Sequence, residues 1–141
     1  MREILFKGKR VDNGEWVYGF LVEALNCVTD KSETFIIEQD ATYFTYGEFA
    51  CAVEVKPETV GQFTGLCDKN GKKIFEGDIV EFTDKYIQKK GRAKIVFEAF
   101  KWKYSGCYYG GNPIVWLCID DGSIEFEVIG NIHDNSELLE E

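Results

Sequence analysis

The residues 59–80, TVGQFTGLCDKNGKKIFEGDIV, hold three short strand-like runs separated by two tight turns. The run 59–66 reads as a strand, and the DKNG sequence at 68–71 reads as a turn with glycine where a positive φ is wanted. A strand at 72–75 then returns, and Glu76, Gly77 and Asp78 form a second turn before the strand at 79–82. Strands and turns at this spacing predict an antiparallel β sheet.

The same pattern continues on both sides of this stretch. The VDNG sequence at 11–14 predicts a hairpin because Asn-Gly accepts positive φ, and Gly19 suggests a bulge or a close backbone approach in the strand that follows. Residues 25–33 and 106–113 read as loops, and 40–52 shows no clean periodicity. Further strands are predicted at 2–9, 15–22, 34–38, 53–56, 92–98, 100–104, 115–119 and 124–129, with the last two as a hairpin around 120–123.

We therefore predict an all-β fold that is mostly antiparallel, either barrel-like or a sandwich, with a short C-terminal helical segment at 135–140. The high aromatic content of 15% and the 14 glycines against only two prolines support strands joined by tight turns. A chain of 141 residues is large enough to bury a core without a disulfide or a metal. No linker divides the sequence, so we expect one domain spanning 1–141.

No apolar run approaches the roughly 20 residues that span a bilayer, and charge interrupts the N-terminus at once. We therefore expect a cytoplasmic protein with no membrane partner. The five cysteines include no Cys-x-x-Cys pair and the chain has one histidine, so we expect reduced thiols, no zinc site and no cofactor.

Catalytic chemistry finds no support in the sequence. A nucleophile–histidine pair would have to use His133, and no cysteine or serine is placed beside it by the pattern. The acidic pairs Asp120-Asp121 and Glu125/Glu127 suit a turn and the solvent face of a strand. No phosphate-binding or hydrolase motif occurs. We predict no catalytic residue and no metal ligand.

The charge of the chain is unevenly distributed. The formal net charge is −9, yet residues 85–104 hold seven Lys and Arg against Glu98 alone, a net +6 that leaves −15 elsewhere. Basic side chains next to aromatic ones suit phosphate contacts and base stacking. The alternation equally predicts buried rings behind a solvated lysine face that protects a sheet edge. The residues predicted for binding are Lys89, Lys90, Arg92, Lys101, Trp102 and Lys103.

Residues 59–80 closely resemble the signature of the YopX family, small proteins of bacteriophages and prophages. Residues 2–8 (REILFKG) with 16–19 (WVYG) are similar to the family's opening, and 128–135 (VIGNIHDN) with 137–139 (ELL) to its close, so the resemblance covers the whole chain. The chain departs from the family at Cys67, where lysine is common, and at Ser136, where proline is common.

The resemblance implies a β-rich, barrel-like fold and offers no functional residue to transfer. The glycines and aspartates of the signature have a structural reading as turn residues. The alternative reading is a shared ligand surface with Gln62, Thr64, Asp68 and Asp78 as polar contacts.

For function we predict a phage or prophage accessory protein that acts as a non-catalytic protein-interaction module in the cytoplasm of the host cell. Its partner would be a host protein, a phage protein or a second copy of the chain. The alternative is nucleic-acid binding through the basic stretch 85–104.

Overall fold

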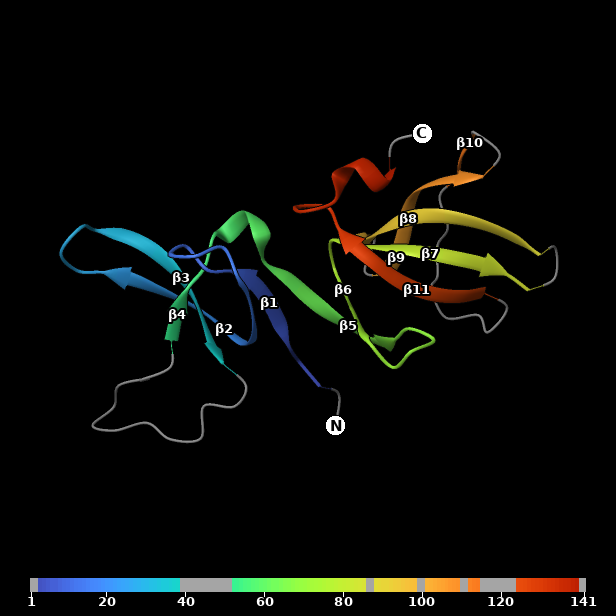
Figure 1. Cartoon of the computed structure of the whole chain (residues 1–141). Coiled ribbons are helices and arrows are strands. Elements are labelled where there is room, and N and C mark those ends of the chain that lie inside the picture. The colour runs from blue at the N-terminus through green and yellow to red at the C-terminus, as the bar shows by residue number, and fades with distance from the viewer. Residues whose placement is uncertain are drawn as a thin grey trace. The chain divides into compact units, whose positions relative to one another are not determined.

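The structure is a computed structural model that describes residues 3–38, 52–85, 88–98, 101–109, 112–114 and 124–139. Its described elements are strands, apart from two short 3-10 helices, η1 (Pro57–Thr59) and η2 (Ser136–Leu139). The chain forms two compact units, unit 1 (Met1–Phe63) and unit 2 (Thr64–Glu141) (Figure 1). None of the helices in the described ranges has the length and apolarity that a transmembrane helix requires.

Unit 1 is built on an antiparallel sheet in which the hydrogen-bonded strand order is β4-β3-β2-β1-β5. The hairpin of β2 and β3 is its longest feature and stays in register from the Gly19–Glu38 pair to the Asn26–Lys31 pair. The strands are β1 (Phe6–Lys9), β2 (Trp16–Asn26), β3 (Lys31–Glu38), β4 (Ala52–Glu54) and β5 (Gly61–Cys67), the last of which continues into unit 2.

The core of unit 1 lies on one face of this sheet and is small. It consists of Val17, Ile36 and Val55, with further apolar side chains of the same face packed against them. The packing around position 8 is tight, because a Cβ there would lie 3.1 Å from the Val55 side chain and would require that side chain to shift. An antiparallel bridge between Arg10 and Val55 ties the end of β1 to the residue that follows β4.

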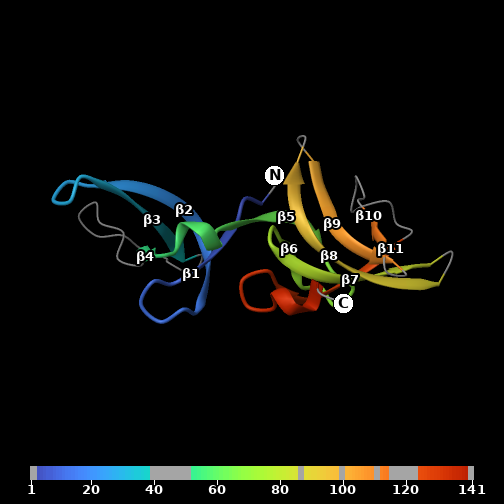
Figure 2. The same ribbon diagram turned by 90° about the horizontal axis from the view of Figure 1, so that it is seen from above.

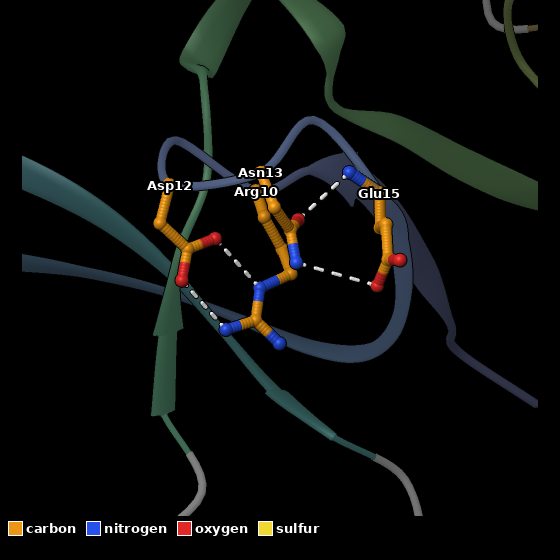
Figure 3. A network of polar contacts seen from close by, with 4 residues as sticks. All are labelled: Arg10, Asp12, Asn13 and Glu15. Atoms are coloured by element: carbon orange, nitrogen blue, oxygen red, sulfur yellow. Dashed lines mark hydrogen bonds and ion pairs between the residues drawn. The ribbon is translucent and has the colours of Figure 1, made fainter.

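The turn between β1 and β2 is held by a local polar network (Figure 3). The Arg10 guanidinium donates two hydrogen bonds to the Asp12 carboxylate, at 2.8 Å from Nε and 2.7 Å from Nη2. The Asn13 side-chain oxygen accepts a bond of 2.9 Å from the Glu15 backbone N–H. Gly14 takes the positive φ of 74° that the Asn-Gly sequence predicted. The network lies at the surface and shapes the hairpin.

Unit 2 contains a second antiparallel sheet, with strand order β10-β9-β8-β7-β11, seen from above in Figure 2. One face of β7 and β8 carries the core, which includes Val80, Phe82, Ala93 and Ile95, each fully buried. The strands are β6 (Lys73–Phe75), which lies beside β5, then β7 (Asp78–Asp84), β8 (Lys89–Glu98), β9 (Lys101–Tyr109), β10 (Asn112–Ile114) and β11 (Ile124–Asn131).

The signature turn at 68–71 closes the outer edge of β11. The Asp68 carboxylate accepts bonds from the backbone N–H groups of Asn70 and Lys72, both at 2.9 Å, and of Val128, at 3.0 Å. The Lys69 N–H donates to the Phe126 carbonyl oxygen at 2.9 Å. Two of these bonds, from Val128 N–H to Asp68 and from Lys69 N–H to the Phe126 carbonyl oxygen, occupy backbone groups at the outer edge of β11.

The predicted mainly antiparallel β fold is confirmed, and the C-terminal helical segment is the single 3-10 turn η2. Among the described strands, neither sheet closes into a barrel. The expectation of one domain over 1–141 stays a prediction, because compactness does not test whether the units fold separately.

Several local predictions were wrong. Residues 25–33 are not a loop, because their pairing extends β2 and β3 on both sides of a turn in which the Asn26 side chain accepts from Val28 N–H. Gly19 forms no bulge. One register shift lies between Val128 and Gly130 in the pairing of β11 with β7, and another lies between Arg92 and Lys94 in the pairing of β8 with β9.

The predicted loop at 106–113 is largely strand, since β9 extends to Tyr109 and pairs with β10. Pro113 is tolerated there because β10 is an edge strand. Residues 124–129 pair with β7. The hairpin partner predicted at 115–119, its turn at 120–123 and most of the 40–52 segment lie outside the described residues.

Candidate interaction surfaces

An exposed apolar surface covers the sheet face of unit 1 that is opposite the core. Side chains alternate along a strand, so the buried Val17 and Gly19 point to the core while Tyr18 and Phe20 point away from it. Cross-strand pairing places Ile37 opposite Phe20 and Phe35 opposite Val22, on the same side. We name this surface the outer face; it comprises Trp16, Tyr18, Phe20, Val22, Phe35 and Ile37.

The aromatic side chains at the centre of the outer face are open to solvent. Phe20 keeps 52% of its surface exposed and Tyr18 keeps 45%, whereas their neighbours on β3 are half-buried. Isolated exposed apolar side chains are normal, whereas neighbouring exposed aromatic ones on one face make that face a candidate interaction surface. The row runs along β2, which is a rigid element that would hold it in place for a partner.

Two lysines of β1 border this row and are directed at Trp16. Lys7 pairs across the ladder with Tyr18, and Lys9 pairs with Trp16. Their ammonium groups lie 4.6 Å and 5.6 Å from the centroid of the Trp16 ring. A cation at this distance from the ring is attracted by the electrons of the aromatic face. The two positive charges are therefore engaged within the face, and Lys7 is only 5% exposed.

On the opposite side of the row, the charged side chains are mainly acidic. Glu54 of β4 is exposed and pairs with Phe35, and Glu33 lies two residues before Phe35 on β3. The Glu33 carboxylate accepts a 2.8 Å bond from the Asn26 side chain. Lys31 is exposed at the hairpin end. The two carboxylates thus flank the apolar row beside Phe35.

Sequence reasoning identified the strand at 15–22 but missed the outer face. Its apolar residues occur on both sides of the alternation, so periodicity could not tell which side was buried. The available signal was Gly19, since a small residue between two aromatic ones indicates the packed side.

The predicted basic site lies on β8 and β9 of unit 2. Lys90 and Arg92 are exposed on β8, and the Cα atoms of Lys101, Trp102 and Lys103 pair with those of Glu98, Phe97 and Val96. Trp102 is thus in register with Phe97. Phe97 lies on the same side of β8 as the buried Ala93 and Ile95, but it is 49% exposed. The side chains of Lys89, Lys101, Trp102 and Lys103 lie outside the described part of the structure.

Acidic residues lie near some of the basic side chains that the structure describes. Lys90 Nζ lies 3.7 Å from Glu81 Oε1, and Arg92 is the cross-strand partner of Glu81. Farther along the same sheet, Lys69 Nζ lies 3.1 Å from Glu127 Oε2 and 3.9 Å from Glu125 Oε1. The basic stretch is therefore part of a mixed-charge surface, which weakens its attraction for a polyanion.

The polar residues of the signature are mostly used inside the fold. Thr64 donates its hydroxyl to the Ile74 carbonyl oxygen at 2.8 Å, and Asp78 accepts from Phe75 N–H at 2.8 Å. Thr64, Asp68 and Asp78 are all buried, and Gln62 is half-buried. These contacts support the structural reading of the signature over the ligand-surface reading.

The carboxylates in this region have pKa values shifted in opposite directions. Burial alone would raise the pKa of Asp68, but the hydrogen bonds from the Val128, Lys72 and Asn70 N–H groups outweigh it and hold the pKa below its ordinary value. Burial raises the pKa of Glu76, which lies in the next turn. A carboxylate tied to three backbone donors is a structural group and is not available as a base.

No catalytic or metal constellation is found among the described residues. His133 is exposed in the turn after β11, where its backbone N–H donates to the Asn131 side chain at 2.9 Å. Cys27 and Cys67 are exposed free thiols. Within the described ranges, no group of three His, Cys, Asp or Glu side chains is arranged to hold a metal ion.

The fold and the outer face together define a small, mainly β protein with an exposed apolar sheet face. The chain belongs to the YopX family: the family model described as YopX protein matches residues 6–140. A crystal structure of protein EF1440 from Enterococcus faecalis is similar, with 24% identity, a TM-score of 0.52 and coverage of 99% of this chain and 100% of that one. This likeness shows the fold alone. A comparison with curated proteins finds no match.

Proposed function

We propose that the chain is a non-catalytic protein-interaction module that binds its partner through the outer face of unit 1. The observation that supports this is the row of aromatic side chains on β2, with Phe20 and Tyr18 about half exposed. Partly exposed aromatic residues supply large contact areas at a low entropic cost, and they are enriched among the residues that dominate binding energies. A partner that covered this row would remove that surface from water.

In this proposal the protein acts in the cytoplasm of a host cell as a phage or prophage accessory protein. Its partner is a host protein, a phage protein or a second copy of the chain, bound through the same row. The alternative, nucleic-acid binding through 85–104, relies on side chains of β9 for its stacking and on Lys90 and Arg92 for its phosphate contacts. Lys90 lies near Glu81, and Arg92 donates a bond of 3.4 Å to the Leu138 carbonyl oxygen, so both cations are engaged within the chain, which favours the protein-interaction reading.

The test is an affinity capture from host lysate with the tagged full chain, with and without nuclease, read by mass spectrometry. The target variant is Tyr18→Ser/Phe20→Ser, and the matched control is Glu23→Gln, an exposed residue that alternates onto the other side of β2. We expect a discrete protein that survives nuclease, is retained by the control and is lost from the double variant.

Two results would contradict the proposal. A captured protein that binds wild type and double variant equally would show that the outer face is not the binding surface. Partners lost on nuclease treatment, and lost again in Lys90→Glu/Arg92→Glu, would favour the nucleic-acid alternative.

A further inference from the structure

We propose that the outer face takes a basic amphipathic polypeptide segment, with an apolar centre flanked by Lys or Arg, as its partner. This inference rests on the proposed function and specifies the chemistry of the partner. The inference is based on the charged side chains that the outer face leaves accessible and on the net charge of unit 1.

The positive charges next to the aromatic row lie over a ring of the row itself. Lys7 is almost fully buried, and the ammonium groups of Lys7 and Lys9 both lie over the Trp16 ring. Both groups are therefore already engaged with an aromatic ring of the face. An anionic partner would therefore gain little from these two lysines.

Of the carboxylates beside the row, Glu54 is open to a partner, and Glu33 keeps one oxygen beyond its bond to Asn26. Glu54 is exposed directly across the ladder from Phe35, and Glu33 is half-buried on the same side of β3. Lys31 stands at the hairpin end, beyond Glu33. A Lys or Arg next to the apolar anchors of the partner would pair with Glu54 or Glu33 while those anchors cover Phe20 and Phe35. Such a mixed contact combines an apolar centre with a charged rim, as protein interfaces commonly do.

The charge of unit 1 extends the same preference to longer range. Residues 1–63 carry six Lys and Arg against eleven Asp and Glu, a net −5 within the chain's −9. A field of this sign raises the association rate of cationic segments and lowers that of nucleic acids. It also opposes face-to-face pairing of two identical copies. A basic amphipathic segment satisfies both the apolar row and the surrounding charge.

An unbiased selection tests the inference. A library of random 12-residue peptides displayed on phage is selected on the full chain, with the Tyr18→Ser/Phe20→Ser variant as the counter-target. We expect enriched peptides that combine aromatic or aliphatic residues with a net positive charge. Synthetic versions should bind the double variant at least tenfold more weakly than wild type.

Charge reversal next to the row provides the second measurement. The variant Glu33→Lys/Glu54→Lys should weaken binding of the selected peptides about tenfold at low salt, and raised salt should weaken wild-type binding. Glu23→Lys is the matched control, because Glu23 is an exposed carboxylate on the other side of β2, and it should change affinity far less.

Enrichment of acidic or uncharged peptides, or equal loss in the Glu23 control and the Glu33/Glu54 variant, would overturn the inference. A chain that dimerises in light scattering through Phe20 would assign the face to a second copy and also overturn it. If lysate capture depends on Tyr18 and Phe20 while the selected peptides are not basic, the proposed function stands and this inference alone falls.

Discussion

Replacing Asp68 should destabilise the fold by removing the bonds that attach the signature turn to β11. The side chain is 8% exposed and its carboxylate accepts three backbone N–H bonds. In Asp68→Ala, the N–H groups of Asn70 and Lys72 lie at exposed residues, where water can replace the lost acceptor. The Val128 N–H is part-buried, and leaving such a donor unsatisfied costs about 1–3 kcal/mol. We expect a total loss of about 2–3 kcal/mol in the free energy of unfolding.

Asp68→Asn separates the Val128 bond from the two turn bonds. Asparagine keeps one acceptor oxygen, which can serve Asn70 and Lys72, but it places an NH2 group where Oδ2 accepts from Val128. Two donors would then face each other, so we expect Asn to reproduce most of the loss seen with Ala. Glu23→Gln removes an exposed carboxylate from β2 and serves as the control for the loss of charge alone.

The assay is chemical denaturation followed by tryptophan fluorescence, repeated between pH 7 and pH 3. Because the folded pKa of Asp68 is lowered, its contribution is complete above the ordinary Asp pKa of about 3.9 and is lost as pH falls through the folded pKa. The difference in the free energy of unfolding between wild type and Asp68→Asn should therefore become smaller only at acid pH. An Asp68→Asn variant that is as stable as wild type at pH 7 would refute the reasoning. A difference in the free energy of unfolding that stays constant down to pH 3 would also refute it.

Three further predictions follow from other contacts. Glu76→Gln should raise the melting temperature at pH 7, because burial raises the pKa of Glu76; the gain should disappear as pH falls through that pKa, and a constant gain would contradict the cause. Gly8→Ala should cost about 1–3 kcal/mol in chemical denaturation because its Cβ would lie 3.1 Å from Val55 and 3.2 Å from Ile36, and a neutral result would show that the core yields. The prediction of one domain over 1–141 implies a single calorimetric transition, which two resolved transitions would rule out.

The sequence predicted the parts of the fold that depend on local chemistry. The Asn-Gly turn before β2 and the DKNG turn at 68–71 formed where they were expected, because few residues accept a positive φ and both turns place glycine there. The strands around them follow from alternation. Local rules did not reveal that Asp68 reaches Val128, 60 residues away in the chain, because such a bond depends on which strand lies next to the turn.

The candidate site was harder to predict because it depends on which side of a strand is buried. Charge counts directed attention to 85–104, but a count along the chain does not show that Glu81 lies across the ladder from Arg92. Conversely, alternation along 15–22 did not show which side of the strand is buried, and only pairing with the rest of unit 1 shows that Val17 and Gly19 lie on the core side. Which side chains are exposed depends on the tertiary fold, so the sequence could not show which of the two candidate surfaces is the better interaction site.

The two units differ in what their strands present to solvent, and this difference indicates where a function is to be sought. In unit 2, Lys90 lies near Glu81, and Lys69 lies between Glu125 and Glu127, an arrangement that keeps a sheet soluble and contributes little to stability. On β2 of unit 1, Tyr18 and Phe20 gain nothing for the fold from their exposed surface and lower the solubility of the chain. Polar residues at both positions would satisfy the alternation of β2 equally well. We therefore propose that a partner, rather than the fold, accounts for their aromatic identity.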